Sequence, residues 1–217
     1  MTDRLILLLP VICLLACGMT LWFEYQQHHA SKLKAKLLAS LAFVGFAWEL
    51  GATDSLYGQL LLIGLLLSLI GDVLLAIQGN KRWFVFGIVA FLLAHVVYAM
   101  AFAGLASVTA RLPMVFPVIL VIMLGIGLWL RSYLSGIFQV AVPAYLLAIG
   151  VMLVMAWLVP VGAPQVYIII GASLFALSDV FVARNRFIKP AFFNRVWGLP
   201  IYYVAQLMLA FSVKLTS

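Results

Sequence analysis

The chain has 217 residues, of which 67% are hydrophobic and 9% are charged, and its mean hydropathy is +1.22. Because a soluble domain of this size cannot bury so much apolar surface in one core, the composition excludes a soluble enzyme. A membrane-spanning helix needs about 20 mostly apolar residues, so the chain has room for eight such helices joined by short connections. The composition therefore predicts a polytopic membrane protein.

Apolar runs separated by short polar breaks predict an all-α protein with eight transmembrane helices. The predicted spans, in chain order, cover residues 4–23, 33–51, 56–77, 83–104, 112–130, 137–159, 165–183 and 196–215. No break between them is long enough to form a soluble domain, so we expect a single transmembrane domain over residues 1–217.

The positive charges are distributed unevenly among the connections. Ten of the thirteen Lys and Arg residues lie at the connections that follow odd-numbered spans, and only Arg4, Arg111 and Lys214 lie on the other side. The positive-inside rule therefore predicts that those connections are cytoplasmic and that both termini are outside. Orientation and anionic lipid headgroups account for the net charge of +7, so no nucleic-acid partner is predicted. Compact loops favour a bacterial inner membrane as the location.

The first two runs carry the cysteines and one lysine of interest. Cys13 and Cys17 lie one helical turn apart, where a disulfide would conflict with helix geometry, so both are interpreted as packing residues. Lys36 opens the second run from the predicted cytoplasmic side. It is expected to bind a phosphate group that enters from the inner leaflet, together with the cations at the exits of the third and seventh runs, Lys81, Arg82, Arg184 and Arg186.

The third and seventh runs each contain an aspartate about one turn before their end, Asp72 and Asp179, in similar local sequences. Such an Asp costs about 2.5–3.5 kcal/mol on insertion scales, so two at matching positions predict a functional site. In the following runs, His95 lies 23 residues after Asp72 and Gln206 lies 27 residues after Asp179. This weak internal repeat predicts two parallel halves of four helices, at about 1–105 and 106–217.

Both aspartates are expected in the cytoplasmic half of the membrane, at depths that allow them to face one cavity. The other runs add polar side chains at comparable depth: His95, Tyr98, Tyr145, Tyr202, Tyr203 and Gln206. Ser178 precedes Asp179 on the seventh run, in a stripe of small and polar residues. One histidine and two aspartates do not form a usual zinc ligand set, so no metal and no cofactor are predicted. The alternative for each Asp is a structural role, either capping a helix or pairing with a loop arginine.

Four motifs in order along nearly the whole chain resemble the YhhN-like lysoplasmalogenases, a family of integral membrane proteins of about this size. The motifs cover Gly71–Ala76, Phe91–Tyr98, Gly171–Asp179 and Tyr202–Gln206. One departure is that the family often has Lys-Pro at the start of the second span, whereas Lys36 is followed here by Leu37.

The resemblance implies hydrolysis of the vinyl ether bond of a lysoplasmalogen, with release of a fatty aldehyde and glycerophosphoethanolamine or glycerophosphocholine. Two carboxyl groups suit this reaction, since one can deliver a proton to the alkenyl carbon while the other deprotonates water. Asp72 and Asp179 are the predicted catalytic pair. The predicted substrate-binding residues are Lys36, His95, Tyr98, Tyr145, Ser178, Tyr203 and Gln206. The implied partners are a lysophospholipid substrate and membrane lipids.

A proton-coupled secondary transporter is the main alternative, because a four-plus-four repeat with paired intramembrane acids is also typical of carriers. Against it, the polar residues cluster in one half of the membrane, and Glu49 is the only acid inside a predicted span in the other half. An intramembrane aspartyl protease is disfavoured because Leu69 replaces the first glycine of its Gly-x-Gly-Asp signature. A lipid-binding protein without turnover is a further alternative.

Overall fold

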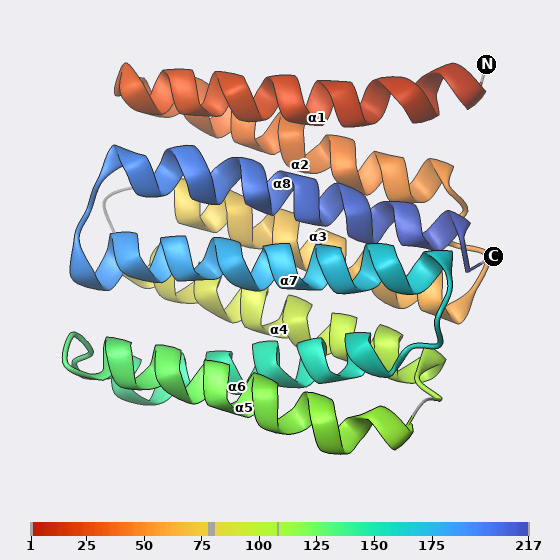
Figure 1. Cartoon of the computed structure of the whole chain (residues 1–217). Helices are drawn as coiled ribbons and strands as arrows, with labels where there is room; N and C mark the ends of the chain where they lie inside the picture. Colours follow the sequence, from red (N-terminus) through yellow and green to blue (C-terminus); the bar gives the residue numbers. More distant parts are fainter. Residues whose placement is uncertain (1, 78–80, 108, 217) are drawn as a thin grey trace.

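The computed structural model describes residues 2–77, 81–107 and 109–216, and within these ranges it is entirely helical (Figure 1). The long helices are α1 (Thr2–Tyr25), α2 (His29–Glu49), α3 (Leu56–Ala76), α4 (Lys81–Leu105), α5 (Leu112–Arg131), α6 (Phe138–Leu158), α7 (Ala163–Ala183) and α8 (Phe192–Lys214). Two short elements are the 3-10 turn η1 (Thr109–Arg111) and the π-helical turn η2 (Arg184–Ile188). Each predicted span falls on one long helix, with ends that differ by four residues or fewer, so the predicted all-α fold is confirmed.

Seven of the described helices, α1 and α3–α8, are long and apolar enough to cross a membrane on their own. The exception is α2, because Lys32, Lys34, Lys36 and Glu49 lower its hydropathy. Lys32 and Lys36 are nevertheless buried and paired with carboxylates, and α2 packs against α1, α3 and α8. Neighbouring helices thus neutralise charges that α2 could not carry alone through lipid, and the chain is an integral membrane protein.

Consecutive helices run in opposite directions, so both chain ends lie at one end of the bundle (Figure 1). The connections that follow α1, α5 and α7 lie at the other end. The last helix, α8, is central, because it contacts α1, α2, α3 and α7, whereas α5 packs on α6 at the edge. Asp72 and Asp179 belong to the tightly packed pairs α3–α4 and α7–α8, and the four-plus-four repeat stays a prediction.

Glycines on α3 let aromatic rings of α4 approach its backbone. A methyl group at Gly64 would overlap the ring of Tyr98, and one at Gly71 would stand 2.6 Å from a ring carbon of Phe91. Small residues commonly permit such close approach between membrane helices. These two glycines therefore set the positions of Tyr98 and Phe91 within the core.

Candidate active site

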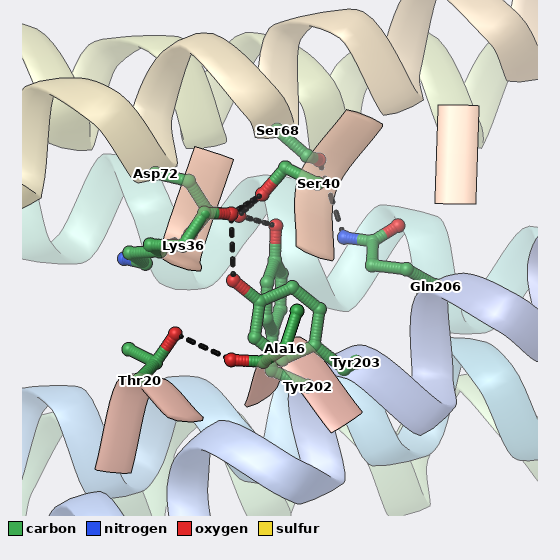
Figure 2. A network of polar contacts seen from close by, with 9 residues as sticks. All are labelled: Ala16, Thr20, Lys36, Ser40, Ser68, Asp72, Tyr202, Tyr203 and Gln206. Atoms are coloured by element: carbon green, nitrogen blue, oxygen red, sulfur yellow. Dashed lines mark hydrogen bonds and ion pairs between the residues drawn. The ribbon is translucent and has the colours of Figure 1, made fainter. Parts of the chain in front are cut away.

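Asp72 lies in the core of the bundle, where three side chains from two other helices contact its carboxylate (Figure 2). Lys36 Nζ of α2 is 2.9 Å from Oδ1. Ser40 Oγ of α2 and Tyr202 Oη of α8 both donate hydrogen bonds to Oδ2, at 2.6 Å and 2.7 Å. Since all three partners are donors, and one is an ammonium, the surroundings of Asp72 complement an ionised carboxylate.

Regular helix spacing brings these partners together. Lys36 and Ser40 are one turn apart on α2, so both side chains face α3. Tyr202 and Tyr203 are consecutive on α8, and Tyr203 Oη donates to the backbone carbonyl of Lys36 at 3.4 Å. Tyr202 therefore hydrogen-bonds the Asp72 carboxylate, and the adjacent Tyr203 hydrogen-bonds the backbone of α2, the helix that carries Lys36.

A second layer of buried polar groups continues one turn further from Asp72. Tyr98 Oη of α4 donates to Gln206 Oε1 at 2.8 Å, and Gln206 Nε2 donates to Ser68 Oγ at 3.2 Å. Ser68 lies one turn before Asp72 on α3. This chain of hydrogen bonds connects α3, α4 and α8 one turn away from Asp72.

Asp179 of α7 lies in a separate polar cluster. Tyr145 Oη of α6 donates to Asp179 Oδ2 at 3.1 Å, and His95 Nε2 of α4 is 3.2 Å from the same oxygen. The side chain of Asp179 is 14% exposed, whereas His95 is fully buried.

The contacts of His95 define where its protons lie. Nδ1 is 2.7 Å from the carbonyl oxygen of Phe91, and because a carbonyl only accepts, Nδ1 carries a proton and donates it. Nε2 is buried without an aligned hydrogen bond, although it is close to the Asp179 oxygen. A bare nitrogen lone pair would repel a carboxylate at this distance, so the contact favours one proton held by the His95–Asp179 pair.

Aromatic rings lie between the two clusters. The ring of His95 packs on Phe175 with 4.3 Å between centroids, and Phe175 contacts Tyr202 at 5.5 Å. Phe91 packs against both Phe175 and Tyr202. Asp72 and Asp179 therefore have separate sets of hydrogen-bond and ion-pair partners, joined by a layer formed by Phe91, Phe175 and Tyr202.

Most of the predicted site residues fall into these two regions. The Asp72 region contains Lys36, Tyr98, Tyr203 and Gln206, and the Asp179 region contains His95 and Tyr145. Ser178 differs, because its hydroxyl donates to the Phe175 carbonyl of its own helix at 2.7 Å.

Sequence reasoning assigned no direct role to Ser40 and Tyr202, which contact Asp72. The available signals were the spacing of Ser40 from Lys36 by one turn and the position of Tyr202 beside Tyr203.

A cavity of about 20 Å³, large enough for one water molecule, lies beside Lys36 where α1, α2, α3 and α8 converge. The side chains that line it include Thr20, Glu24, Lys32, Lys36, Ala76 and Arg195. Lys32 Nζ is 3.0 Å from Glu24 Oε2, and Arg195 Nε is 3.9 Å from Glu24 Oε1. We call this hollow, with its three cations and one acid, the cationic cavity.

Two further features bear on what the protein can bind. An apolar groove of about 410 Å³ runs between α7 and α8, lined by Leu174, Val196, Trp197, Pro200, Ile201 and Val204. Among the described residues, no group of three or more His, Cys, Asp or Glu side chains lies close enough together to hold a metal ion.

The fold and the site together define the class of this protein: it is an all-helical integral membrane protein with a polar site, made of acidic, basic and cationic side chains, buried among its helices. The sequence profile of the YhhN family matches residues 31–213, and the chain belongs to this family. The resemblance inferred from the four motifs is thereby confirmed. The match begins within α2, so α1 lies outside it.

Relatives of known name include mammalian and bacterial proteins. Lysoplasmalogenase TMEM86A of Bos taurus is 34% identical over 157 residues, which cover 69% of this chain and 63% of that protein. Lysoplasmalogenase TMEM86B of Homo sapiens is 30% identical over 197 residues, or 88% of this chain and 79% of that protein. A lysoplasmalogenase of Mycobacterium tuberculosis is 32% identical over 175 residues, or 78% and 63%. The match with TMEM86A thus spans less than two thirds of that relative's length, and no solved structure matches the chain.

Proposed function

We propose that this protein is a lysoplasmalogenase, which hydrolyses the vinyl ether bond of an alkenyl-glycerophosphoethanolamine or alkenyl-glycerophosphocholine. The products are a fatty aldehyde and the corresponding glycerophosphodiester. The observation that carries the proposal is the position of Lys36, which contacts the Asp72 carboxylate and also lines the cationic cavity. The relatives named lysoplasmalogenase support the same activity.

The cavity itself has room for one water molecule, but its mouth, where the side chains of Glu24 and Arg195 are 26% and 42% exposed, suits the phosphate of such a substrate. Lys32 and Arg195 offer charged donors there, and Arg and Lys are the usual partners of phosphate oxygens. Lys32 and Lys36 are one turn, about 6 Å, apart along α2. This separation is comparable with the distance between the phosphate and the sn-1 oxygen of a glycerophospholipid, so a phosphate at Lys32 directs the vinyl ether towards Asp72.

The reaction requires a proton donor and a proton acceptor. A proton is added to the alkenyl carbon distal to the ether oxygen, and water attacks the resulting oxocarbenium carbon and loses a proton. The hemiacetal hydroxyl then loses its proton as the bond between its carbon and the glycerol oxygen breaks, and the glycerol oxygen takes up a proton, so the aldehyde and the glycerophosphodiester separate without net proton change. We assign proton donation to the His95–Asp179 pair, because the contact between these two residues favours a shared proton. We assign proton acceptance to Asp72, because hydrogen-bond donors surround its carboxylate.

The aromatic layer supplies a further function in this scheme. A substrate that contacts both Asp72 and Asp179 lies against Tyr202 and Phe175, because the rings of these two residues lie between the two clusters. The oxocarbenium intermediate is a cation, and the faces of aromatic rings attract cations. The alkenyl chain would lie among apolar helix faces, such as the groove between α7 and α8.

We further propose that the connections after α1, α5 and α7 are cytoplasmic, because the positive charges concentrate at this end. Both termini would then be outside the cell, and the site would lie in the cytoplasmic half of a bacterial inner membrane.

The activity is tested with protein purified in mild detergent. Aldehyde released from lysoplasmalogen is measured through NADH oxidation by alcohol dehydrogenase, with a saturated lysophospholipid as the control substrate. Aldehyde from the vinyl ether lipid alone, lost in folded Asp72→Asn and Asp179→Asn proteins, is the expected result. If folded wild-type protein binds the lysolipid but releases no aldehyde, the proposal is wrong and a carrier or lipid-binding protein is favoured, to be tested by flux across liposomes.

A further inference from the structure

Glu24 is the one acid among the described residues that line the cationic cavity. It comes from α1, which lies outside the part of the chain matched by the family profile. Its carboxylate reaches Lys32 of α2 at 3.0 Å and Arg195 of α8 at 3.9 Å. The side chains of Glu24 and Arg195 are 26% and 42% exposed, so both can exchange partners with a bound molecule.

Two cations share one carboxylate in the cavity. Lys36 is already paired with Asp72, which leaves the positive charges of Lys32 and Arg195 against the single negative charge of Glu24. A phosphodiester placed between Lys32 and Arg195 offers both cations a second acceptor besides Glu24. When the phosphate takes Lys32 or Arg195 as its partner, however, Glu24 loses that partner and lies close to another negative group.

We propose that Glu24 makes the mouth of the cavity selective for a zwitterionic headgroup, with Lys32 and Arg195 binding the phosphate and Glu24 binding the ammonium group of ethanolamine or choline. The ammonium replaces the cation that Glu24 gives up to the phosphate. A headgroup with the same phosphate but no amine leaves Glu24 unpaired beside a negative charge. The inference rests on the proposed function for the identity of the lipid, and it adds the residue that distinguishes among headgroups.

A structural role for Glu24 would give a different result. If the carboxylate only tethers α1 to α2 and α8, its removal changes the affinity for all headgroups by the same factor. Selectivity between headgroups, rather than absolute affinity, is therefore the informative quantity.

The test measures equilibrium binding of two 1-O-alkyl lysolipids, which lack the vinyl ether and cannot be hydrolysed. One has a phosphoethanolamine headgroup, and the other has phosphoglycerol, which keeps the phosphodiester but has no ammonium. Wild-type protein should prefer phosphoethanolamine, and Glu24→Gln should reduce this preference roughly three- to tenfold. Glu24→Asp keeps the charge and should retain more of the preference, while Glu49→Gln neutralises an exposed acid at the other end of α2 and should leave the preference unchanged.

Equal affinity of wild-type protein for the two lipids overturns the inference without any variant. An unchanged preference in folded Glu24→Gln overturns it as well. Because these lipids are not substrates, the outcome does not depend on turnover. Failure of the proposed function is detected separately, as absence of aldehyde release from the corresponding vinyl ether lipids.

Discussion

Lys36 and Asp72 form a buried ion pair, with 2.9 Å between Nζ and Oδ1, where α2, α3 and α8 meet. Both side chains are less than 10% exposed. Removing one member of a buried pair leaves an uncompensated charge, whereas replacing both members can be close to neutral. This pair therefore gives a way to separate the contribution of the two residues to stability from their contribution to turnover.

Asp72→Asn should lower the free energy of unfolding by about 3–5 kcal/mol, because the buried Lys36 ammonium loses its counter-ion. The double variant Lys36→Met with Asp72→Asn should recover much of this loss, since no buried charge is left without a partner. Neither the single variant nor the double variant should turn over substrate, because both lack the Asp72 carboxylate. Thermal unfolding in detergent and aldehyde release, measured on the same preparations, check the two expectations. Turnover in the stable double variant would show that the Asp72 carboxylate is not needed for chemistry.

Tyr202→Phe removes the hydroxyl that donates to Asp72 Oδ2 at 2.7 Å and keeps the ring in the aromatic layer. We expect a loss of stability of about 1–3 kcal/mol and a fall in kcat of tenfold or more, because the Asp72 carboxylate loses one of the hydrogen bonds that orient it. Steady-state kinetics and thermal unfolding measure the two effects.

Tyr57→Phe is the matched control for Tyr202→Phe. Tyr57 is also buried, and its hydroxyl lies 2.6 Å from Ser212 Oγ, near the other end of the bundle. Its removal should cost similar stability and leave kcat close to wild type. An equal fall in kcat in both variants would mean that Tyr202 acts only through general stability.

His95→Gln should reduce kcat about 100-fold or more, the usual contribution of a positioned acid or base, because the proton shared with Asp179 is lost. Tyr145→Phe removes only one donor to the same carboxylate, so its effect should be smaller. If proton transfer to carbon limits the rate, the wild-type reaction has a solvent deuterium isotope effect. Rate measurements in H₂O and D₂O check this. A His95→Gln protein with wild-type kcat would remove the pair from the mechanism.

The sequence was sufficient to predict the eight helices and most of the polar core. Long apolar runs between short polar breaks correspond to single helices, because the bilayer requires each spanning segment to satisfy its own backbone. The polar residues inside those runs could be identified because polar side chains are costly, and therefore rare, within a membrane span. The separation of Asp72 from Asp179 was not predictable, since depth along a helix gives no information on rotation about its axis or on which neighbour faces each side chain.

The cationic cavity was also beyond sequence reasoning. Lys32 and Arg195 are among the ten positive charges at the predicted cytoplasmic connections, but their contact with Glu24 depends on α8 packing against α1 and α2. Arg195 and Glu24 are far apart in sequence and belong to no common motif. Only the path of the last helix through the bundle brings them together.

Gly64→Ala tests whether close packing of α3 on α4 positions the second polar layer. A methyl group at residue 64 overlaps the ring of Tyr98, whose hydroxyl donates to Gln206. We expect destabilisation of about 1–3 kcal/mol from this overpacking, together with reduced turnover because the hydrogen bond to Gln206 is displaced. Gly125→Ala on α5 is the control, since no atom lies within 4 Å of its added methyl group. It should be neutral or slightly stabilising, as alanine favours the helix more than glycine does. Equal stability and turnover in the two variants would mean that α4 shifts without strain and that the position of Tyr98 is not set by Gly64.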